Sequence, residues 1–203
     1  DPLIIAGQGT IGLEIFEQLP DPDFIIGSIG GGGMMSGIGI AAKALRAKTQ
    51  VIGCQAQGAS SMTQSLQKGA AVRLPSVQTF ADGIAVKNAS DRMRLILAGV
   101  LDDAIASAVL LLLEKGKIVA EGSAAITLAA CGALKSKLKG KKVVVIVSGG
   151  NIDVNLLSRI IDRALIQEGR RVRVNVWLPD RPGSLARLTE LVASEGANVL
   201  QAI

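Results

Sequence analysis

Residues 24–35 read FIIGSIGGGGMM, and this stretch decides the fold. Its first six residues are mostly apolar and β-branched, which predicts a short buried strand. A helix is predicted to begin near Met34, so Gly30, Gly31, Gly32 and Gly33 stand between the strand and the helix. Glycine has no Cβ, which lets successive N–H groups turn toward one anion, and the positive end of the helix dipole adds to that attraction. We therefore predict that these four residues, called the glycine loop below, bind a phosphate group.

Short apolar runs and helical stretches alternate on both sides of this stretch. Strands are predicted over 3–6, 24–29 and 50–54, and helices over 10–19 and 34–47. This βαβαβ order predicts an α/β fold with a parallel sheet covered by helices. Helices are also predicted over 60–68, 91–101, 105–114, 123–134 and 154–168, and a buried strand over 143–147.

A second turn of small residues, Ser148-Gly149-Gly150-Asn151, follows the strand predicted over 143–147. Ligands of parallel α/β sheets bind beyond the carboxyl ends of the strands, which would place the Ser148 hydroxyl beside a ligand. The other interpretation is a simple turn. The spacing alone does not choose between the two.

An earlier glycine pattern, Gly7-x-Gly9-x-x-Gly12, matches the spacing of a dinucleotide-binding turn at the first predicted strand-to-helix junction. Such a site also requires an acidic residue about 20 positions further on, to hold the ribose hydroxyl. Ser28 and the glycine loop occupy that region instead. A nicotinamide site is therefore disfavoured.

The composition excludes several kinds of protein. The 203 residues are 49% hydrophobic but only 2% aromatic, and they include no histidine, so the chain cannot contain a Ser-His-Asp triad. The net charge of +5 comes from scattered residues with almost no aromatic side chains beside them, so no nucleic-acid partner is expected. Cys54 and Cys131 match no metal-ligand spacing, and no metal site is predicted.

No membrane segment is expected. The longest apolar stretch, residues 105–113, is about half as long as a membrane-spanning helix. The chain opens on Asp1-Pro2 and leads directly into a predicted strand, so no signal peptide is expected either. These features predict a cytoplasmic protein.

A domain boundary is predicted at Gly169, which divides the chain into residues 1–168 and 169–203. The pattern changes there, because residues 172–178 alternate between apolar and polar positions as a half-exposed strand would. A turn follows, and Ser184 is predicted to cap a helix that ends before Gly196. About 35 residues are too few for an independent core, so the second domain is expected to be incomplete.

Six ordered motifs resemble those of the threonine dehydratases, also called threonine ammonia-lyases. They are residues 6–15, the glycine loop with Ser36 and Gly37, residues 51–53, 81–87, 121–125 and 148–153. The resemblance implies the tryptophan-synthase-β-like fold of pyridoxal-phosphate enzymes, present here in part. It also implies pyridoxal 5′-phosphate as cofactor.

The same resemblance assigns cofactor-binding residues. The glycine loop and Met34 correspond to the segment that holds the cofactor phosphate, and Ser148 to the serine that faces the pyridine nitrogen. A neutral hydroxyl at that nitrogen leaves the ring a milder electron acceptor than a carboxylate would, which suits β-elimination. Glu121 corresponds to a glutamate near the cofactor, and a helix-start carboxylate is the equally weighted alternative.

The last residues resemble the start of an ACT domain, an α+β module that binds amino-acid effectors at dimer interfaces in this family. The resemblance implies allosteric regulation in a homo-oligomer. It makes effector-binding candidates of Asp180, Gly183, Ser184, Leu185 and Asn198.

The family's lysine, which forms the Schiff base with the cofactor, lies in a Ser-x-Lys-x-Arg motif that is absent from these 203 residues. No catalytic residue is therefore predicted in the chain, which we expect to be an inactive fragment without its N-terminal part. The resemblance implies that the full-length protein deaminates L-threonine, and L-serine as well, within isoleucine biosynthesis. The alternatives are a non-catalytic effector-binding fragment and a serine/threonine racemase.

Overall fold

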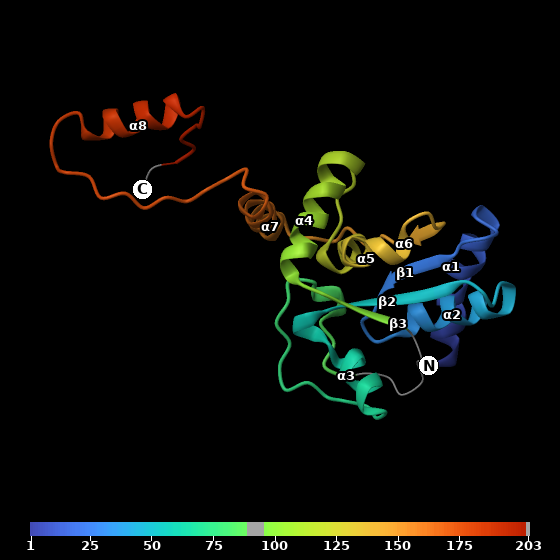
Figure 1. Cartoon of the computed structure of the whole chain (residues 1–203). Coiled ribbons are helices and arrows are strands. Elements are labelled where there is room, and N and C mark those ends of the chain that lie inside the picture. The colour runs from blue at the N-terminus through green and yellow to red at the C-terminus, as the bar shows by residue number, and fades with distance from the viewer. Residues whose placement is uncertain (89–95, 202–203) are drawn as a thin grey trace. The chain divides into compact units, whose positions relative to one another are not determined.

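The computed structural model describes residues 1–88 and 96–201. The chain divides into two compact units, Asp1–Arg171 and Val172–Ile203, and each is described by itself (Figure 1). No helix among the described residues is long and apolar enough to cross a membrane.

The first unit is built on a parallel sheet, as predicted, and the sheet has four strands. Its strands are β1 (Phe24–Ser28), β2 (Gln50–Ala56), β3 (Ile96–Val100) and β4 (Val143–Val145), in the order β3-β2-β1-β4. Ser28 pairs with Cys54, and Cys54 with Ala98, so the carboxyl ends of the central strands share one edge. β4 is shorter than predicted and only partly buried, because it lies at the edge of the sheet.

Helices cover both faces of the sheet, and β1 contributes to both cores. Ile25 and Ile29 pack with α1 (Pro2–Gln18) and α2 (Gly33–Leu45). Phe24 and Ile26 belong to the opposite core, which includes α4 (Asp102–Leu111), α5 (Gly122–Ala133) and α7 (Val154–Gln167). Successive side chains of a strand point to opposite faces, so an apolar strand can serve two cores. The remaining helical elements of the first unit are η1 (Gln57–Ala59), α3 (Ser61–Lys68), η2 (Asp82–Ile84), the π-helical turn η3 (Leu112–Gly116) and α6 (Lys135–Leu138).

The strand predicted over 3–6 is wrong, because these residues lie in α1. Asp1 caps this helix by accepting a hydrogen bond from the Leu3 N–H at 2.8 Å, and Pro2 occupies the first turn, where its missing N–H is not needed. The Gly-x-Gly-x-x-Gly pattern therefore lies inside a helix rather than at a strand-to-helix turn. Its role is packing, because a Cβ on Gly37 of α2 would lie only 2.5 Å from the backbone nitrogen of Gly9.

The helix predicted over 91–101 is also wrong where it can be compared. Residues 96–100 form β3, and the earlier residues of that prediction lie outside the described part of the chain. β3 pairs along its length with β2, from Ile96 opposite Ile52 to Val100 opposite Ala56. Hydrogen bonds to a neighbouring strand outweigh the local helical pattern here.

The second unit contains α8 (Ser184–Ser194). The strand predicted over 172–178 is wrong, since the structure assigns no strand there, and an extended segment becomes a strand only when another pairs with it. Ser184 is the first residue of α8 rather than its cap. The cap is Gly183, whose φ of 84° is the left-handed conformation that glycine adopts readily.

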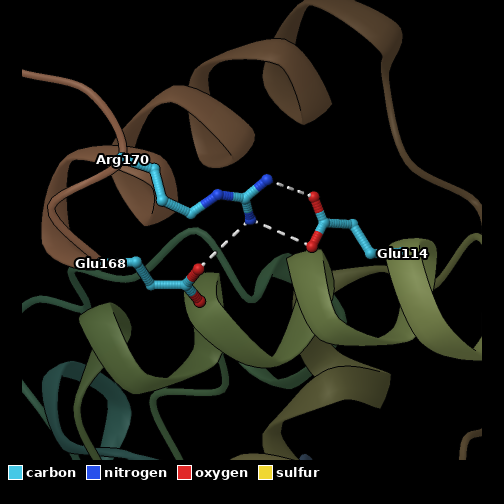
Figure 2. A network of polar contacts seen from close by, with 3 residues as sticks. All are labelled: Glu114, Glu168 and Arg170. Atoms are coloured by element: carbon cyan, nitrogen blue, oxygen red, sulfur yellow. Dashed lines mark hydrogen bonds and ion pairs between the residues drawn. The ribbon is translucent and has the colours of Figure 1, made fainter. Parts of the chain in front are cut away.

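An ion-pair network ties the end of α7 to the π-helical turn η3. The guanidinium of Arg170 donates to both carboxylate oxygens of Glu114, at 3.0 and 2.8 Å, and more weakly to Glu168 at 3.4 Å (Figure 2). All three residues lie within the first unit.

Candidate functional site

A cavity of about 300 Å³ lies where the glycine loop meets the carboxyl edge of the sheet. It brings together every residue predicted to bind the cofactor, although these residues span more than a hundred positions in sequence. Its lining consists of Ser28, Gly30, Gly31, Gly32, Gly33, Met34, Met35, Gly83, Ile84, Glu121, Ser123 and Ser148.

The glycine loop presents backbone donors to this cavity. Gly32 has a φ of 92° and is the N-cap of α2, with no side-chain hydrogen bond to the helix start. Within residues 1–88 and 96–201, the N–H groups of the glycine loop donate no hydrogen bond. Free N–H groups at a helix N-terminus attract an anion, so this end of the cavity suits a phosphate.

The loop is also held close to its surroundings. The N–H of Ile29 donates to the carbonyl of Cys54 at 2.8 Å, which anchors the start of the loop to β2. A Cβ on Gly30 would lie 3.2 Å from the carbonyl oxygen of Gly83. The backbone of residues 82–84 therefore forms the adjoining wall.

Glu121 is the acidic residue of the cavity. It is the N-cap residue of α5, but its side chain makes no capping hydrogen bond. Its carboxylate instead accepts a hydrogen bond from the Ser123 hydroxyl, and its N–H donates to the carbonyl of Gly149 at 3.1 Å. The geometry thus turns the carboxylate toward the cavity rather than onto the helix start.

Ser148 follows β4 and is an exposed residue that lines the cavity. The backbone of Gly149 lies close to the carboxylate, because a Cβ there would lie 2.6 Å from Oε1 of Glu121 and would require that carboxylate to move. The pairing of the Ser148 hydroxyl with a ring nitrogen stays a prediction.

Sequence reasoning assigned no role to five lining residues: Ser28, Met35, Gly83, Ile84 and Ser123. Gly83, Ile84 and Ser123 do fall inside the motifs at 81–87 and 121–125, so motif membership was the available signal. No periodicity could have joined these segments, because the contacts between them are made only by the folded sheet.

A larger hollow of about 920 Å³ runs along α1 and α2, with a mostly apolar lining that includes Leu13 and Ile40. None of the glycine-loop residues and no Asp or Glu side chain lines this hollow. The smaller cavity carries the chemistry that a charged ligand needs.

The predicted effector-binding residues lie in the second unit. Asp180 belongs to the bend before α8, Gly183 caps that helix, and Ser184 and Leu185 are its first residues. Asn198 follows the helix and is exposed. Their role as an effector site stays a prediction.

Metal and thiol chemistry have little support in the described part of the chain. No group of three or more His, Cys, Asp or Glu residues is placed to hold a metal ion within residues 1–88 and 96–201. Cys54 is fully buried within β2, and burial raises the pKa of its thiol to about 12. Burial also raises the pKa of Cys131.

Comparison with known proteins identifies relatives over most of the chain. The family described as "Pyridoxal-phosphate dependent enzyme" matches residues 1–149. An L-threonine ammonia-lyase of Thermotoga maritima is 46% identical over an alignment that covers 98% of this chain and 51% of that protein. The chain thus spans about half the length of the curated relatives it matches.

Solved structures that resemble the chain include the following two. One is the processed form of threonine deaminase isoform 2 from Solanum lycopersicum, with a TM-score of 0.77 and 35% identity, covering 82% of this chain and 48% of that one. The other is maize serine racemase, with a TM-score of 0.70 and 34% identity, covering 81% of this chain and 54% of that one.

Proposed function

This chain belongs to the family of pyridoxal-phosphate dependent enzymes, and on that premise we propose that the protein containing it deaminates L-threonine to a 2-oxo acid and ammonia. L-serine is the second proposed substrate, and isoleucine biosynthesis the proposed context. The relatives named L-threonine ammonia-lyase support this choice.

The residues of the cavity fit the cofactor. A phosphate requires clustered N–H donors, and the uncapped first turn of α2 with the glycine loop supplies them. A side chain at Gly30 would also narrow the cavity, because its Cβ would stand 3.2 Å from the carbonyl oxygen of Gly83. The structure therefore supports the glycine loop and Met34 as the phosphate-binding segment.

The single observation that carries the proposal is the combination of groups in one cavity. Anion-binding N–H groups, the neutral hydroxyl of Ser148 and the carboxylate of Glu121 line the same 300 Å³. When bound, pyridoxal phosphate supplies an electron-withdrawing ring for the α-carbon of an amino acid. Ser148 would hydrogen-bond the ring nitrogen without adding a charge, and Glu121 would accept a hydrogen bond from the ligand.

The 203 residues contain no Ser-x-Lys-x-Arg motif, so the lysine that the family requires would come from elsewhere in the protein. Lys43, Lys87, Lys115 and Lys117 do not line the cavity. We accordingly propose that this chain alone binds the cofactor but is catalytically inactive.

A chimera tests the activity. The lysine-bearing half of the Thermotoga maritima relative, fused to this chain, should release ammonia and a 2-oxo acid from L-threonine, whereas the chain alone should not. The matched control replaces that lysine by alanine in the same chimera. If the folded chimera binds pyridoxal phosphate but releases no ammonia from L-threonine or L-serine, the proposed activity is wrong.

Serine racemisation is a second candidate, because maize serine racemase shares the fold at 34% identity. The same chimera distinguishes the two, since a racemase would convert L-serine to D-serine faster than it releases ammonia.

For residues 169–203 we propose an incomplete ACT domain that takes an amino-acid effector within a homo-oligomer. Effector binding to Asp180, Gly183, Ser184, Leu185 and Asn198 is testable by alanine substitution and calorimetry with candidate amino acids.

A further inference from the structure

Ser123 lines the cavity, yet neither its position in the motif nor the resemblance assigns it a role. It is 4% exposed, and its hydroxyl donates to Oε1 of Glu121, two residues before it. Glu121 is the N-cap residue of α5, but its side chain makes no capping hydrogen bond, and the carboxylate accepts a hydrogen bond from the Ser123 hydroxyl instead. The bond therefore influences where the carboxylate lies.

Two glycine backbones enclose this pair of side chains. A Cβ on Gly83 would lie 2.7 Å from the Ser123 hydroxyl oxygen and 3.3 Å from Oε1 of Glu121. On the other side, a Cβ on Gly149 would lie 2.6 Å from the same carboxylate oxygen. A side chain at either glycine would displace the carboxylate or its hydroxyl donor from this arrangement, so both glycine backbones lie close to the pair.

The charges in the cavity determine which part of a ligand can bind beside the carboxylate. The glycine loop attracts an anion, whereas Glu121 repels one. When a phosphate binds to the glycine loop, Glu121 can therefore contact only the remaining, non-phosphate part of the ligand. The hydrogen bond from Ser123 uses one of the acceptor sites of the carboxylate, and its other lone pairs can accept a hydrogen bond from a hydroxyl or ammonium group.

From this geometry we propose that Ser123 is a positioning residue, whose hydroxyl orients the Glu121 carboxylate toward a hydrogen-bond donor on the non-phosphate part of the ligand. The inference rests on the proposed cofactor, but it requires no catalysis. Ser123 acts through Glu121 and does not itself contact the ligand.

The test measures binding of two probes to the full 203-residue chain by calorimetry. Pyridoxine 5′-phosphate carries a ring hydroxyl, a hydroxymethyl group and a phosphate, and without an aldehyde it cannot react with surface lysines. Inorganic phosphate probes the glycine loop alone. Ser123→Ala should weaken pyridoxine 5′-phosphate about three- to tenfold, the effect of one lost hydrogen bond, and leave phosphate affinity within about twofold.

A double-mutant cycle separates positioning from direct contact. In a Glu121→Ala background, Ser123→Ala should cause no further loss of pyridoxine 5′-phosphate affinity, because the group that it orients is gone. Effects that add in the double variant would overturn the inference, as would a Ser123→Ala chain that binds like the unsubstituted one. Equal losses for both probes would also overturn it, since they would indicate general damage to the cavity.

Ser65→Ala is the matched control. Ser65 is a buried serine of α3 whose hydroxyl donates to the Ser61 carbonyl at 2.7 Å and accepts from the Val72 N–H at 2.8 Å, outside the cavity. It should bind both probes as the unsubstituted chain does. If Ser123→Ala fails to fold, Gly149→Ala is the second variant, since its methyl group displaces the carboxylate directly and should selectively weaken pyridoxine 5′-phosphate.

The outcome is distinguishable from that of the proposed activity. Selective loss in these variants, together with no turnover by the chimera, would uphold the positioning role and refute the ammonia-lyase activity. Failure of the unsubstituted chain to bind pyridoxine 5′-phosphate would overturn the inference itself.

Discussion

Gly37→Ala should destabilise the first unit, although alanine favours helices. The added Cβ would lie 2.4 Å from the carbonyl oxygen of Ile5 and 2.5 Å from the nitrogen of Gly9, whereas ordinary contact begins at 3.4 Å. Both obstacles are backbone atoms of α1, which cannot rotate away as a side chain can. The two helices would therefore have to separate by about 1 Å, which breaks the close packing between them.

Gly7→Ala is the matched control, because a Cβ at Gly7 in α1 has nothing within 4 Å. Each substitution gains about 1 kcal/mol from replacing a helical glycine. Overpacking costs about 1–3 kcal/mol, and two backbone obstacles place Gly37 near the upper end. Gly7→Ala should thus stabilise by about 1 kcal/mol and Gly37→Ala destabilise by about 2 kcal/mol, a difference of about 6–12 °C in Tm for a chain of this size.

Thermal unfolding followed by circular dichroism measures this difference, and phosphate binding gives a second measurement. The N-terminus of α2 adjoins the glycine loop, so displacement of α2 by Gly37→Ala should also weaken phosphate binding, whereas Gly7→Ala should not. A Gly37→Ala chain as stable as Gly7→Ala would refute the packing role assigned here to the Gly-x-Gly-x-x-Gly pattern.

Three further predictions concern the glycine loop, the ion-pair network and the thiols. Gly32→Ala should weaken phosphate binding and lower stability by about 1–2 kcal/mol, because Gly32 has a φ of 92°, which strains an alanine backbone. Calorimetry would measure the binding and thermal unfolding the stability. Unchanged values would refute the predicted strain. Arg170 lowers the pKa of Glu114 below its usual 4.5, so the ion pair stabilises the fold while Glu114 is ionised. The Tm difference between Arg170→Gln and the unsubstituted chain should be present above about pH 4.5 and vanish as the pH falls through the lowered pKa. A difference that grows in acid would contradict this. With a thiol pKa of about 12, Cys54 should have about one part in 10⁴ as thiolate at pH 8, so mass spectrometry should find iodoacetamide modification there only after unfolding.

The proposed phosphate-binding segment could be predicted from the sequence because it is local. The glycine loop, the strand before it and the helix after it are contiguous, so their chemistry can be read from neighbouring residues. Ser148 and Glu121 were found through resemblance to a family. Neither approach assigned a role to Ser123 or Gly83. The hydroxyl of Ser123 contacts Glu121 only two residues away, but that both line a cavity with Gly83, forty residues earlier, is decided by the fold.

The helix predicted over 10–19 lies almost entirely in α1, whereas the strand predicted over 3–6 failed for a related reason. Leu3, Ile4 and Ile5 form an apolar run that suits a strand, and only Asp1-Pro2 indicated a helix start. The outcome depended on α2, whose Gly37 lets α1 approach closely at Gly9. A single-segment pattern does not contain that information.

The sequence by itself determined the parallel α/β core and the strand, glycine loop and helix that can bind a phosphate, because apolar periodicity and the absence of Cβ atoms act over a few neighbouring residues. Only the tertiary structure decided that residues 2–18 are helical, that residues 96–100 are a strand, and that Ser123 and Gly83 meet Glu121 in the cavity. Those outcomes depend on which distant segments pair and pack, since the hydrogen bonds and close contacts that select them exist only after the chain has folded.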